Sequence, residues 1–456
     1  MTGKSHHTPA SAITHKKAWI VSVVMGLGHL RAAYPLRDLA CEYVMIDEGS
    51  PYCSPDEAKL WKRIKDTYYF MARAEAIPFF GKIIFNGMLA MQSIQPYYPM
   101  RDLSNPTWGS KYLNSLLKDN KLCGTLLRAL EPSSIPVVST FYATAIAADK
   151  SDKIKDNYLV ICDSDINRVW VPERPSESHI KYFAPCTQVK RRLMLYGVPE
   201  ESIFLTGFPL PKENIGDKKK LEILKEDLFQ RLLRLDPKDR FFKFHSKSSL
   251  NMLEKHSLPK TREDCFSLTF AVGGAGVHTE TAYKILKSLK VKIIDGRIKL
   301  NLSAGTRQET AKKFLEYIDS LKLSGYVGTG IKIIHDNDVN KYFDKFNRIL
   351  RETDVLWTKP SELSFYCALG LPIVLAPAVG SHENLNKDWL ISVHAGIIPP
   401  GPVEFVDQWL FDLRDTGRLA EAAWDGFLKA RKLGTYKIEE IIQTGKMTSG
   451  DSPFEF

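Results

Sequence analysis

Three groups of polar residues in this chain have the types and spacing needed for proton transfer and for binding a hydroxyl-rich ligand. His29 follows a glycine-rich turn, Gly26-Leu-Gly28, and a neutral imidazole at a cleft edge can act as a general base. Asp163 and Asp165 directly follow an apolar segment, where a carboxylate can hold or deprotonate a hydroxyl. The third group supplies hydrogen-bonding and charged side chains near the end of the chain, and consists of Lys359, Ser361, Glu362, Ser381, His382, Glu383 and Asn386.

A second glycine-rich turn, Gly273-Gly-Ala-Gly276, lies between an apolar segment and a predicted helix. Bare backbone can approach a phosphate closely, and a helix N-terminus offers free N–H groups and a positive dipole. The turn matches neither the GxGxxG pattern nor a P-loop, so NAD binding and P-loop catalysis are disfavoured. The residues expected to bind a diphosphate are Gly273, Gly274, Ala275, Gly276, Val277 and His278.

Each of these features also has a purely structural interpretation. Glycine clusters serve tight turns, His29 can satisfy a turn, and the two aspartates can cap the next segment. Arg31 either neutralises an anion or lies in solvent. The features therefore gain weight only from the elements that would bring them together.

Those elements alternate between apolar strands and helices, which predicts βαβ units and parallel sheets. Helix is predicted through most of 55–130, and at 187–196, 218–235, 279–289 and 405–432. Strands are predicted at 18–25, 135–141, 158–162, 181–185, 203–206, 265–272, 298–302, 330–334, 355–357 and 372–375. The polar groups follow several of these strands, and ligands of doubly wound folds bind at strand carboxyl ends. We interpret 376–386 as a polar loop.

Composition narrows the class of protein further. The chain has 456 residues, a net charge of +10 and seven cysteines without a CxxC pair. The length predicts more than one domain, and the charge predicts a negatively charged partner such as a nucleotide diphosphate or an anionic membrane surface. The cysteine pattern predicts reduced thiols in a cytoplasm-like compartment. The basic residues are spread, which disfavours nucleic-acid binding, and we expect no metal site. Residues 77–91 favour a buried core helix, with a membrane-surface segment as the alternative.

The order of short motifs resembles that of GT-B glycosyltransferases of family 28, which include the lipid-II-forming N-acetylglucosaminyltransferase and the monogalactosyldiacylglycerol synthases. The similarity spans about Trp19 to Gly396 and is weakest over 50–130. The landmarks are Gly26-Leu-Gly-His29, Val160-Ile-Cys-Asp163, Trp170, Tyr182-Phe-Ala-Pro185, Gly197-Val-Pro199, Thr206-Gly-Phe-Pro209, Gly273-Gly-Ala-Gly276, Thr358-Lys-Pro360, Gly370-Leu-Pro372 and His382-Glu383-x-x-Asn386.

The resemblance implies an α/β protein of GT-B architecture, with two Rossmann-like doubly wound parallel-sheet domains that face a central cleft. The limits it suggests are a disordered tail at 1–17, an acceptor domain at 18–211, a donor domain at 212–405, and helices at 406–456 that cross back to the first domain. It implies metal-independent, inverting hexosyl transfer from a nucleotide sugar, usually a UDP-sugar, to a sugar or lipid-linked acceptor. We expect no cofactor, and a cytoplasmic protein, peripheral on the inner membrane face if it meets lipid.

The same resemblance assigns roles to the candidate residues. His29 or Asp163 would deprotonate the acceptor, and the donor would be held by the group from Lys359 to Asn386. The acceptor side would include Gly26, Gly28, Arg31, Asp165 and Trp170. The chain departs from the family pattern where Phe365 stands at the position of the ribose-binding Glu, so that Glu362 is the substitute. Two alternatives remain open, a nucleotide-sugar epimerase on the same fold and a catalytically inactive GT-B-like binding protein.

Overall fold

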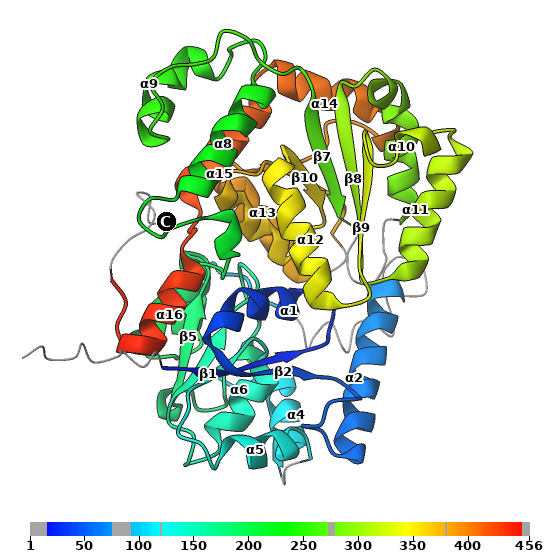
Figure 1. Cartoon of the computed structure of the whole chain (residues 1–456). Coiled ribbons are helices and arrows are strands. Elements are labelled where there is room, and N and C mark those ends of the chain that lie inside the picture. Colours follow the sequence, from blue (N-terminus) through cyan, green and yellow to red (C-terminus); the bar gives the residue numbers. More distant parts are fainter. Residues whose placement is uncertain (1–15, 75–92, 119–120, 272–278, 379–380, 449–456) are drawn as a thin grey trace, which may run out of the picture.

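The structure is a computed structural model, and it describes residues 16–74, 93–118, 121–271, 279–378 and 381–448. Figure 1 shows two lobes, one drawn in blue and cyan and the other in green, yellow and orange. Each lobe is built around one six-stranded sheet, and every strand pair in both sheets is parallel. The predicted fold class, a GT-B arrangement of two Rossmann-like sheets, is therefore confirmed.

The first lobe has the strand order β2-β1-β3-β4-β5-β6. Its strands are β1 (Ala18–Val23), β2 (Ala40–Ile46), β3 (Val137–Ser139), β4 (Asn157–Val160), β5 (Ile180–Ala184) and β6 (Ile203–Leu205). Its helices and 3-10 turns include α1 (Gly28–Ala33), η1 (Tyr34–Leu39), α2 (Pro55–Ala74), α4 (Trp108–Leu117), α5 (Gly124–Leu130), α6 (Tyr142–Asp149) and α7 (Thr187–Leu195). The central strands are almost fully buried, as expected for a sheet covered on both faces.

The second lobe has the order β12-β11-β10-β7-β8-β9. Its strands are β7 (Phe266–Ala271), β8 (Ile298–Gly305), β9 (Ile331–His335), β10 (Val355–Thr358), β11 (Ile373–Leu375) and β12 (Gly396–Ile397). The flanking elements include α8 (Glu222–Leu235), α9 (Phe242–Met252), α10 (Thr279–Ile294), α11 (Gln308–Ser320), α12 (Val339–Glu352), η8 (Glu362–Leu369), α13 (Ser381–Ser392), α14 (Val406–Asp415) and α15 (Arg418–Lys429).

Each sheet has a point where the direction of strand succession reverses. In the first lobe this point lies between β1 and β3, and in the second lobe it lies between β7 and β10. Doubly wound folds bind ligands in the crevice outside the carboxyl ends of the strands at such a switch point. The loops after these four strands are therefore the ones to inspect for a site.

Three sequence-based expectations differ from the structure. Strand β2 was not predicted, because Glu42 and Cys41 are exposed at its edge and break the apolar run. Strand β12 has only two residues and is too short to leave a pattern. The polar loop expected at 376–386 is wrong in its second part, since α13 begins at Ser381. Polar and acidic side chains are favoured in a first helical turn, so they do not distinguish a loop from a helix start.

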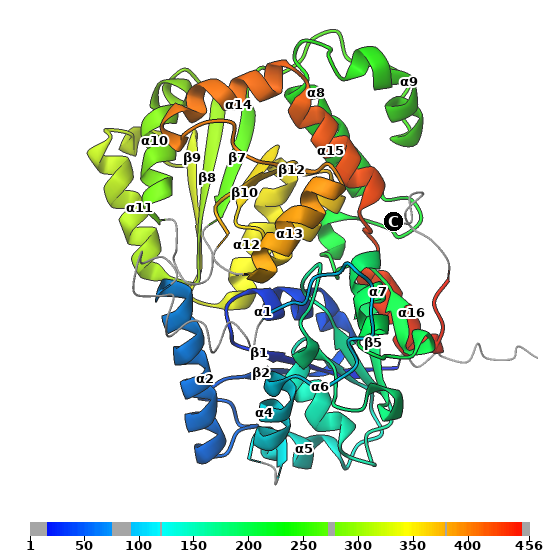
Figure 2. The same ribbon diagram turned by 180° about the vertical axis from the view of Figure 1, so that it is seen from behind.

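The end of the described chain returns to the first lobe. Figure 2 shows α14 and α15 on the second lobe and α16 (Gly434–Thr444) beside β5 and α7 of the first. A Cβ on Gly434 would lie 2.1 Å from the carbonyl oxygen of Phe208, so only glycine permits this approach. Thr435 Oγ1 then donates to the carbonyl of Leu210 at 2.5 Å. The domain limits stated above remain predictions.

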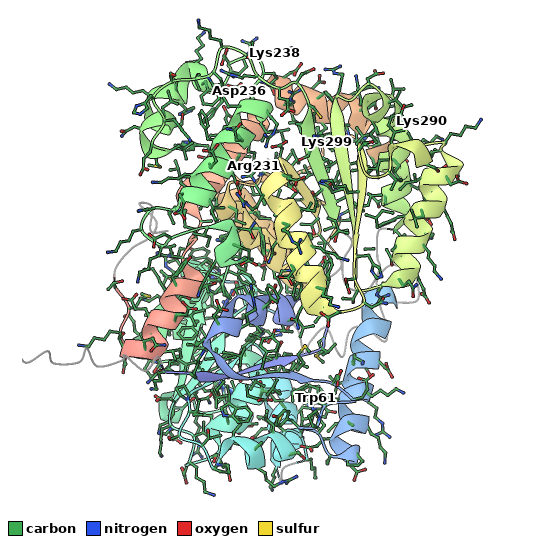
Figure 3. All side chains as sticks on the ribbon, in the orientation of Figure 1. Trp61, Arg231, Asp236, Lys238, Lys290 and Lys299 are labelled. Carbon is green, nitrogen blue, oxygen red and sulfur yellow. The ribbon has the colours of Figure 1, made fainter. Side chains whose placement is uncertain are left out.

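A buried arginine fixes the elements that lead to the second switch point. Figure 3 places Arg231 inside the second lobe, on α8. Its guanidinium donates to the carbonyls of Thr353 (2.7 Å) and Leu369 (2.8 Å), at the start of β10 and the end of η8. The arginine therefore supplies hydrogen bonds to carbonyls on both sides of the β10–η8 segment, just before β10 and at the end of η8. No helix among the described residues is both long and apolar enough to cross a bilayer.

Candidate active site between the two lobes

His29 lies at the switch point of the first sheet, on the first turn of α1. Its Nδ1 is 2.7 Å from the carbonyl oxygen of Thr140, which follows β3. A carbonyl can only accept, so Nδ1 carries the proton and Nε2 keeps its lone pair. The ring packs edge-on against Phe141, with centroids 5.0 Å apart, and lies 6.2 Å from Trp170. The imidazole is thus oriented by one hydrogen bond and an aromatic wall, with Nε2 available as a base.

His29 is buried and has two carboxylates near it, and these two features act on its pKa in opposite directions. Burial lowers the pKa of His29, while the charges of Asp163 and Glu362 act in the opposite direction and His382 lowers it further. The net lowering keeps the imidazole neutral near pH 7, as a base requires. Cys162 lies 3.6 Å from Nδ1 through its sulfur. Burial raises the pKa of that thiol, so Cys162 contacts the histidine as a neutral group.

Asp163 is held by a residue of the other lobe. Asn386 Nδ2 donates to Asp163 Oδ1 at 2.9 Å, and Asn386 Oδ1 accepts from the amide of Ser164 at 2.8 Å. Asn386 Nδ2 also approaches the carbonyl of Pro360 at 3.4 Å. Both ends of its buried amide are thus engaged within the protein, and the expectation that Asn386 binds donor hydroxyls stays a prediction.

Arg31 and Glu362 form the second link between the lobes. Arg31 Nε is 3.2 Å from Glu362 Oε1, and the side chains are 3% and 12% exposed. A Cβ on Gly28 would lie 3.2 Å from Glu362 Oε2, so a glycine here lets α1 approach the carboxylate. Arg31 is therefore buried against the second lobe, and its guanidinium is the ion-pair partner of Glu362.

Two of the remaining donor-side residues, Lys359 and His382, lie beside Glu383. Lys359, which follows β10, forms an ion pair with Glu383 on α13. His382 Nε2 lies 4.0 Å from the same carboxylate and is one-third exposed. Ser361 is nearly buried at 9%, and Ser381 is the first residue of α13. Lysine and histidine from consecutive strand-end segments thus converge on one buried carboxylate.

Two residues assigned to the acceptor side are buried. Asp165 receives Arg192 Nε and Nη2, each at 2.8 Å, and Gln188 at 3.1 Å. Its side chain is 1% exposed and engaged within the protein, and its role on the acceptor side stays a prediction. Trp170 is 6% exposed and contributes to the wall behind His29. Gly26 has a φ of +78°, which its position in the turn after β1 requires.

Some sequence-based expectations lie outside the described residues. These are the diphosphate turn from Gly273 to His278, the segment at 77–91 and most of the N-terminal tail. The described helix α10 begins directly after that turn and follows β7, at the switch point.

A pocket of about 460 Å³ lies between the lobes. It is bounded by the carboxyl ends of β1 and β2 on one side and of β8 and β9 on the other. Its polar lining comes from Asp47, Thr306, Arg307, Asn337 and Asp338, and its apolar lining includes Val24, Leu27, Leu30, Met45 and Val339. This size and mixture are typical of small-molecule sites, which range over roughly 300–1,000 Å³.

The sequence interpretation missed several residues of this region. Thr140 follows a predicted strand, so the strand-end rule could have identified it. Asp47 follows β2, which was not predicted. Tyr34, whose hydroxyl donates to Asp344 across the lobes, gave no signal, because such a contact depends on how the two lobes pack.

Three comparisons with known proteins found similar sequences and structures. A family model described as "Domain of unknown function (DUF6938)" matches residues 322–437, which include β9 to β12 and the donor-side residues. A processive diacylglycerol beta-glucosyltransferase from Bacillus cytotoxicus is 21% identical over 268 residues, covering 58% of this chain and 55% of that protein. The chain thus spans about half the length of this curated relative. The match bears out the resemblance to GT-B glycosyltransferases.

Among solved structures, similarity extends over nearly the whole chain at low identity. The S. aureus MnaA–UDP co-structure is 12% identical with a TM-score of 0.48, covering 96% of this chain and 100% of that one. The Neisseria meningitidis UDP-GlcNAc 2-epimerase bound to UDP-GlcNAc is 10% identical with a TM-score of 0.46, covering 93% and 97%.

Proposed function

We propose that this protein is a glycosyltransferase that moves a sugar from a nucleotide-diphosphate donor, a UDP-sugar in the first instance, to an acceptor hydroxyl. The observation that carries the proposal is the contact between the lobes at their switch points: a Cβ on Gly28, next to His29, would lie 3.2 Å from Glu362 Oε2, and Asp163 accepts from Asn386 at 2.9 Å. On the first lobe, His29 presents Nε2 as a base. On the second lobe, the segments after β10 and β11 carry Lys359, His382 and Glu383. This arrangement suits proton removal from an acceptor opposite a bound donor.

In this mechanism His29 Nε2 takes the proton of the acceptor hydroxyl as the oxygen attacks the anomeric carbon. The negative charge of Asp163 stabilises the imidazolium that forms, since that charge raises the pKa of His29. The leaving diphosphate gathers charge as the glycosidic bond breaks. The N-terminus of α10, which is 16 residues long, would stabilise it together with the preceding glycine turn.

The order of the strands suggests how the donor lies. A diphosphate at the turn after β7 would have β8 and β9 on one side and β10 and β11 on the other. The inter-lobe pocket lies on the β8–β9 side and would take the nucleoside. Lys359 and His382 lie on the β10–β11 side, near Glu383, and would meet the sugar. An acceptor carried by a lipid is part of the same proposal and would approach from the first lobe.

The test is calorimetric titration of the full chain with UDP, GDP, ADP and TDP, followed by incubation with the matching nucleotide sugars. We expect one diphosphate to bind in the micromolar range. Absence of binding by every member of the panel would refute the donor site. A nucleotide sugar that turns over without an acceptor and gains solvent deuterium in its sugar would identify an epimerase. Tight binding without any turnover would identify an inactive binding protein.

A further inference from the structure

Asn386 connects three loops that belong to two different sheets. It lies on α13, which follows β11 of the second lobe, and its side chain is fully buried. Its amide nitrogen donates to Asp163 Oδ1, after β4 of the first lobe, and approaches the carbonyl of Pro360, after β10. Its amide oxygen accepts from the backbone of Ser164. These contacts join the end of β4 to the ends of β10 and β11.

The contacts leave the side chain a single orientation. Exchanging the amide oxygen and nitrogen would put N–H against the amide of Ser164 and oxygen against the carboxylate of Asp163, which is unfavourable at both ends. A hydrogen bond from an amide N–H to a carboxylate is also directional and strong. Asn386 therefore fixes which way the carboxylate of Asp163 points.

We propose that Asn386 is a positioning residue of the catalytic centre: it orients Asp163 beside His29, so that a residue of the second lobe completes the base on the first. The inference rests on the proposed function in one respect, that His29 and Asp163 are taken as the groups that act on the acceptor. Asn386 touches no reacting atom in this mechanism.

The side chains around His29 come from both lobes. Cys162, directly before Asp163, has its sulfur 3.6 Å from His29 Nδ1, and a Cβ on Gly28 would lie 3.2 Å from Glu362 Oε2 of the second lobe. The charges of Asp163, Glu362 and His382 all act on the imidazole. Glu362 is in turn held by Arg31. Both carboxylates that favour the protonated imidazole are thus fixed by contacts between the lobes. Loss of either inter-lobe contact would leave His29 in place but release one of the charges beside it.

The primary experiment does not require turnover. The imidazole of His29 is titrated by NMR in the full chain with labelled histidine, in the wild type and in Asp163→Asn, Asn386→Ala and Asn384→Ala variants. Asn384 is exposed on the same helix and serves as the matched control. We expect Asp163→Asn and Asn386→Ala to lower the pKa of His29 in the same direction, and Asn384→Ala to leave it unchanged.

Three results would overturn the inference. An unchanged titration in Asn386→Ala would show that the amide does not orient Asp163. A rise in the pKa of His29 in Asn386→Ala would show that the lobes have separated and that His29 is no longer buried. Asn386 would then only hold the lobes together and would not orient Asp163. No effect of Asp163→Asn would remove Asp163 from the centre. Thermal unfolding of each variant, compared with Asn384→Ala, identifies any that fails to fold, and Asn386→Leu, which keeps the side-chain volume without the amide, then replaces Asn386→Ala.

Once a nucleotide sugar that the protein turns over is known, steady-state kinetics provide a second test of the role of Asn386. We expect Asn386→Ala to reduce kcat at least tenfold while the Kd for the nucleotide stays within twofold. Asn386→Asp places a second carboxylate against Asp163, and should move the acid limb of the kcat/KM profile to higher pH. A loss confined to nucleotide affinity would instead make Asn386 a donor-binding residue. If no nucleotide binds at all, the proposed function fails, while the NMR titration still decides whether Asn386 orients Asp163.

Discussion

Arg31 of the first lobe and Glu362 of the second form an ion pair of 3.2 Å at the point where the two switch points meet. The guanidinium carbon also lies 4.6 Å from the ring centre of Phe346 and 4.8 Å from that of Phe343 on α12. Arginine stacks well on aromatic faces while its N–H groups remain available for a carboxylate. The pair therefore holds the lobes together from within, beside the proposed base.

Removing the carboxylate of this pair should destabilise the protein strongly. Glu362→Ala would leave Arg31 buried without its counter-charge, and breaking a buried pair costs about 3–5 kcal/mol; partial exposure of Glu362 favours the lower end of that range. Urea unfolding measures the loss. Glu421→Ala removes an exposed partner of Arg418 and is the control, with a change below about 1 kcal/mol. Equal losses for the two variants would contradict a structural role for the inter-lobe pair.

Replacing His29 should remove the catalytic base without changing the affinity for the nucleotide. His29→Ala is expected to lower kcat by about 10²–10⁴-fold, the usual contribution of general base catalysis, with an unchanged Kd for the nucleotide. His256→Ala, at an exposed position, is the control. A His29→Ala variant with wild-type kcat would leave Asp163 as the base.

The pH dependence of the same residue has a defined sign. Burial lowers the pKa of His29 below its ordinary value of about 6.5, and the base works only when it is unprotonated. Activity should therefore persist below pH 6.5 and fall at the lowered pKa. Because the unfolded chain binds that proton more tightly, the stability from His29 is complete above about pH 6.5 and is lost as pH falls toward the lowered value. An acid limb above pH 7 would contradict this environment.

The sequence predicted the parts of the site that depend on local pattern. Apolar strands ending in polar residues located His29, Asp163 and Lys359 correctly at strand carboxyl ends, because parallel sheets place those ends together. The pattern could not show which polar groups bond to one another. Asp165 and Asn386 look like ligand-binding residues in sequence, yet their polar atoms are used by Arg192 and by the opposite lobe. Such pairings depend on tertiary packing, which leaves no local periodicity.

The buried pair between Asp165 and Arg192 gives a stability prediction that is independent of function. Both side chains are 1% exposed, so Asp165→Ala leaves an uncompensated arginine and should cost about 3–5 kcal/mol. Chemical denaturation measures this, and calorimetry with the bound nucleotide should show an unchanged Kd. A folded Asp165→Ala variant that loses acceptor turnover, with stability intact, would return Asp165 to the acceptor side.

Chelation tests the expected metal independence. With an active donor and acceptor, dialysis against EDTA should leave the initial rate within about twofold of the untreated enzyme, since the leaving diphosphate is assigned to helix and backbone donors. If EDTA treatment abolishes the rate, and Mg²⁺ or Mn²⁺ restores it relative to treated enzyme without added metal, a divalent cation helps to stabilise the leaving diphosphate.

Filling the inter-lobe pocket should block the nucleoside specifically. Met45 lies on β2 and lines the pocket of about 460 Å³, so Met45→Trp adds an indole where the nucleoside is placed. We expect nucleotide affinity to fall at least about tenfold, equivalent to 1.4 kcal/mol. Cys41→Trp, at an exposed position of the same strand, adds the same ring away from the pocket and should leave the Kd unchanged. If both variants bind the nucleotide as the wild type does, the nucleoside lies elsewhere in the cleft, and the pocket belongs to the acceptor.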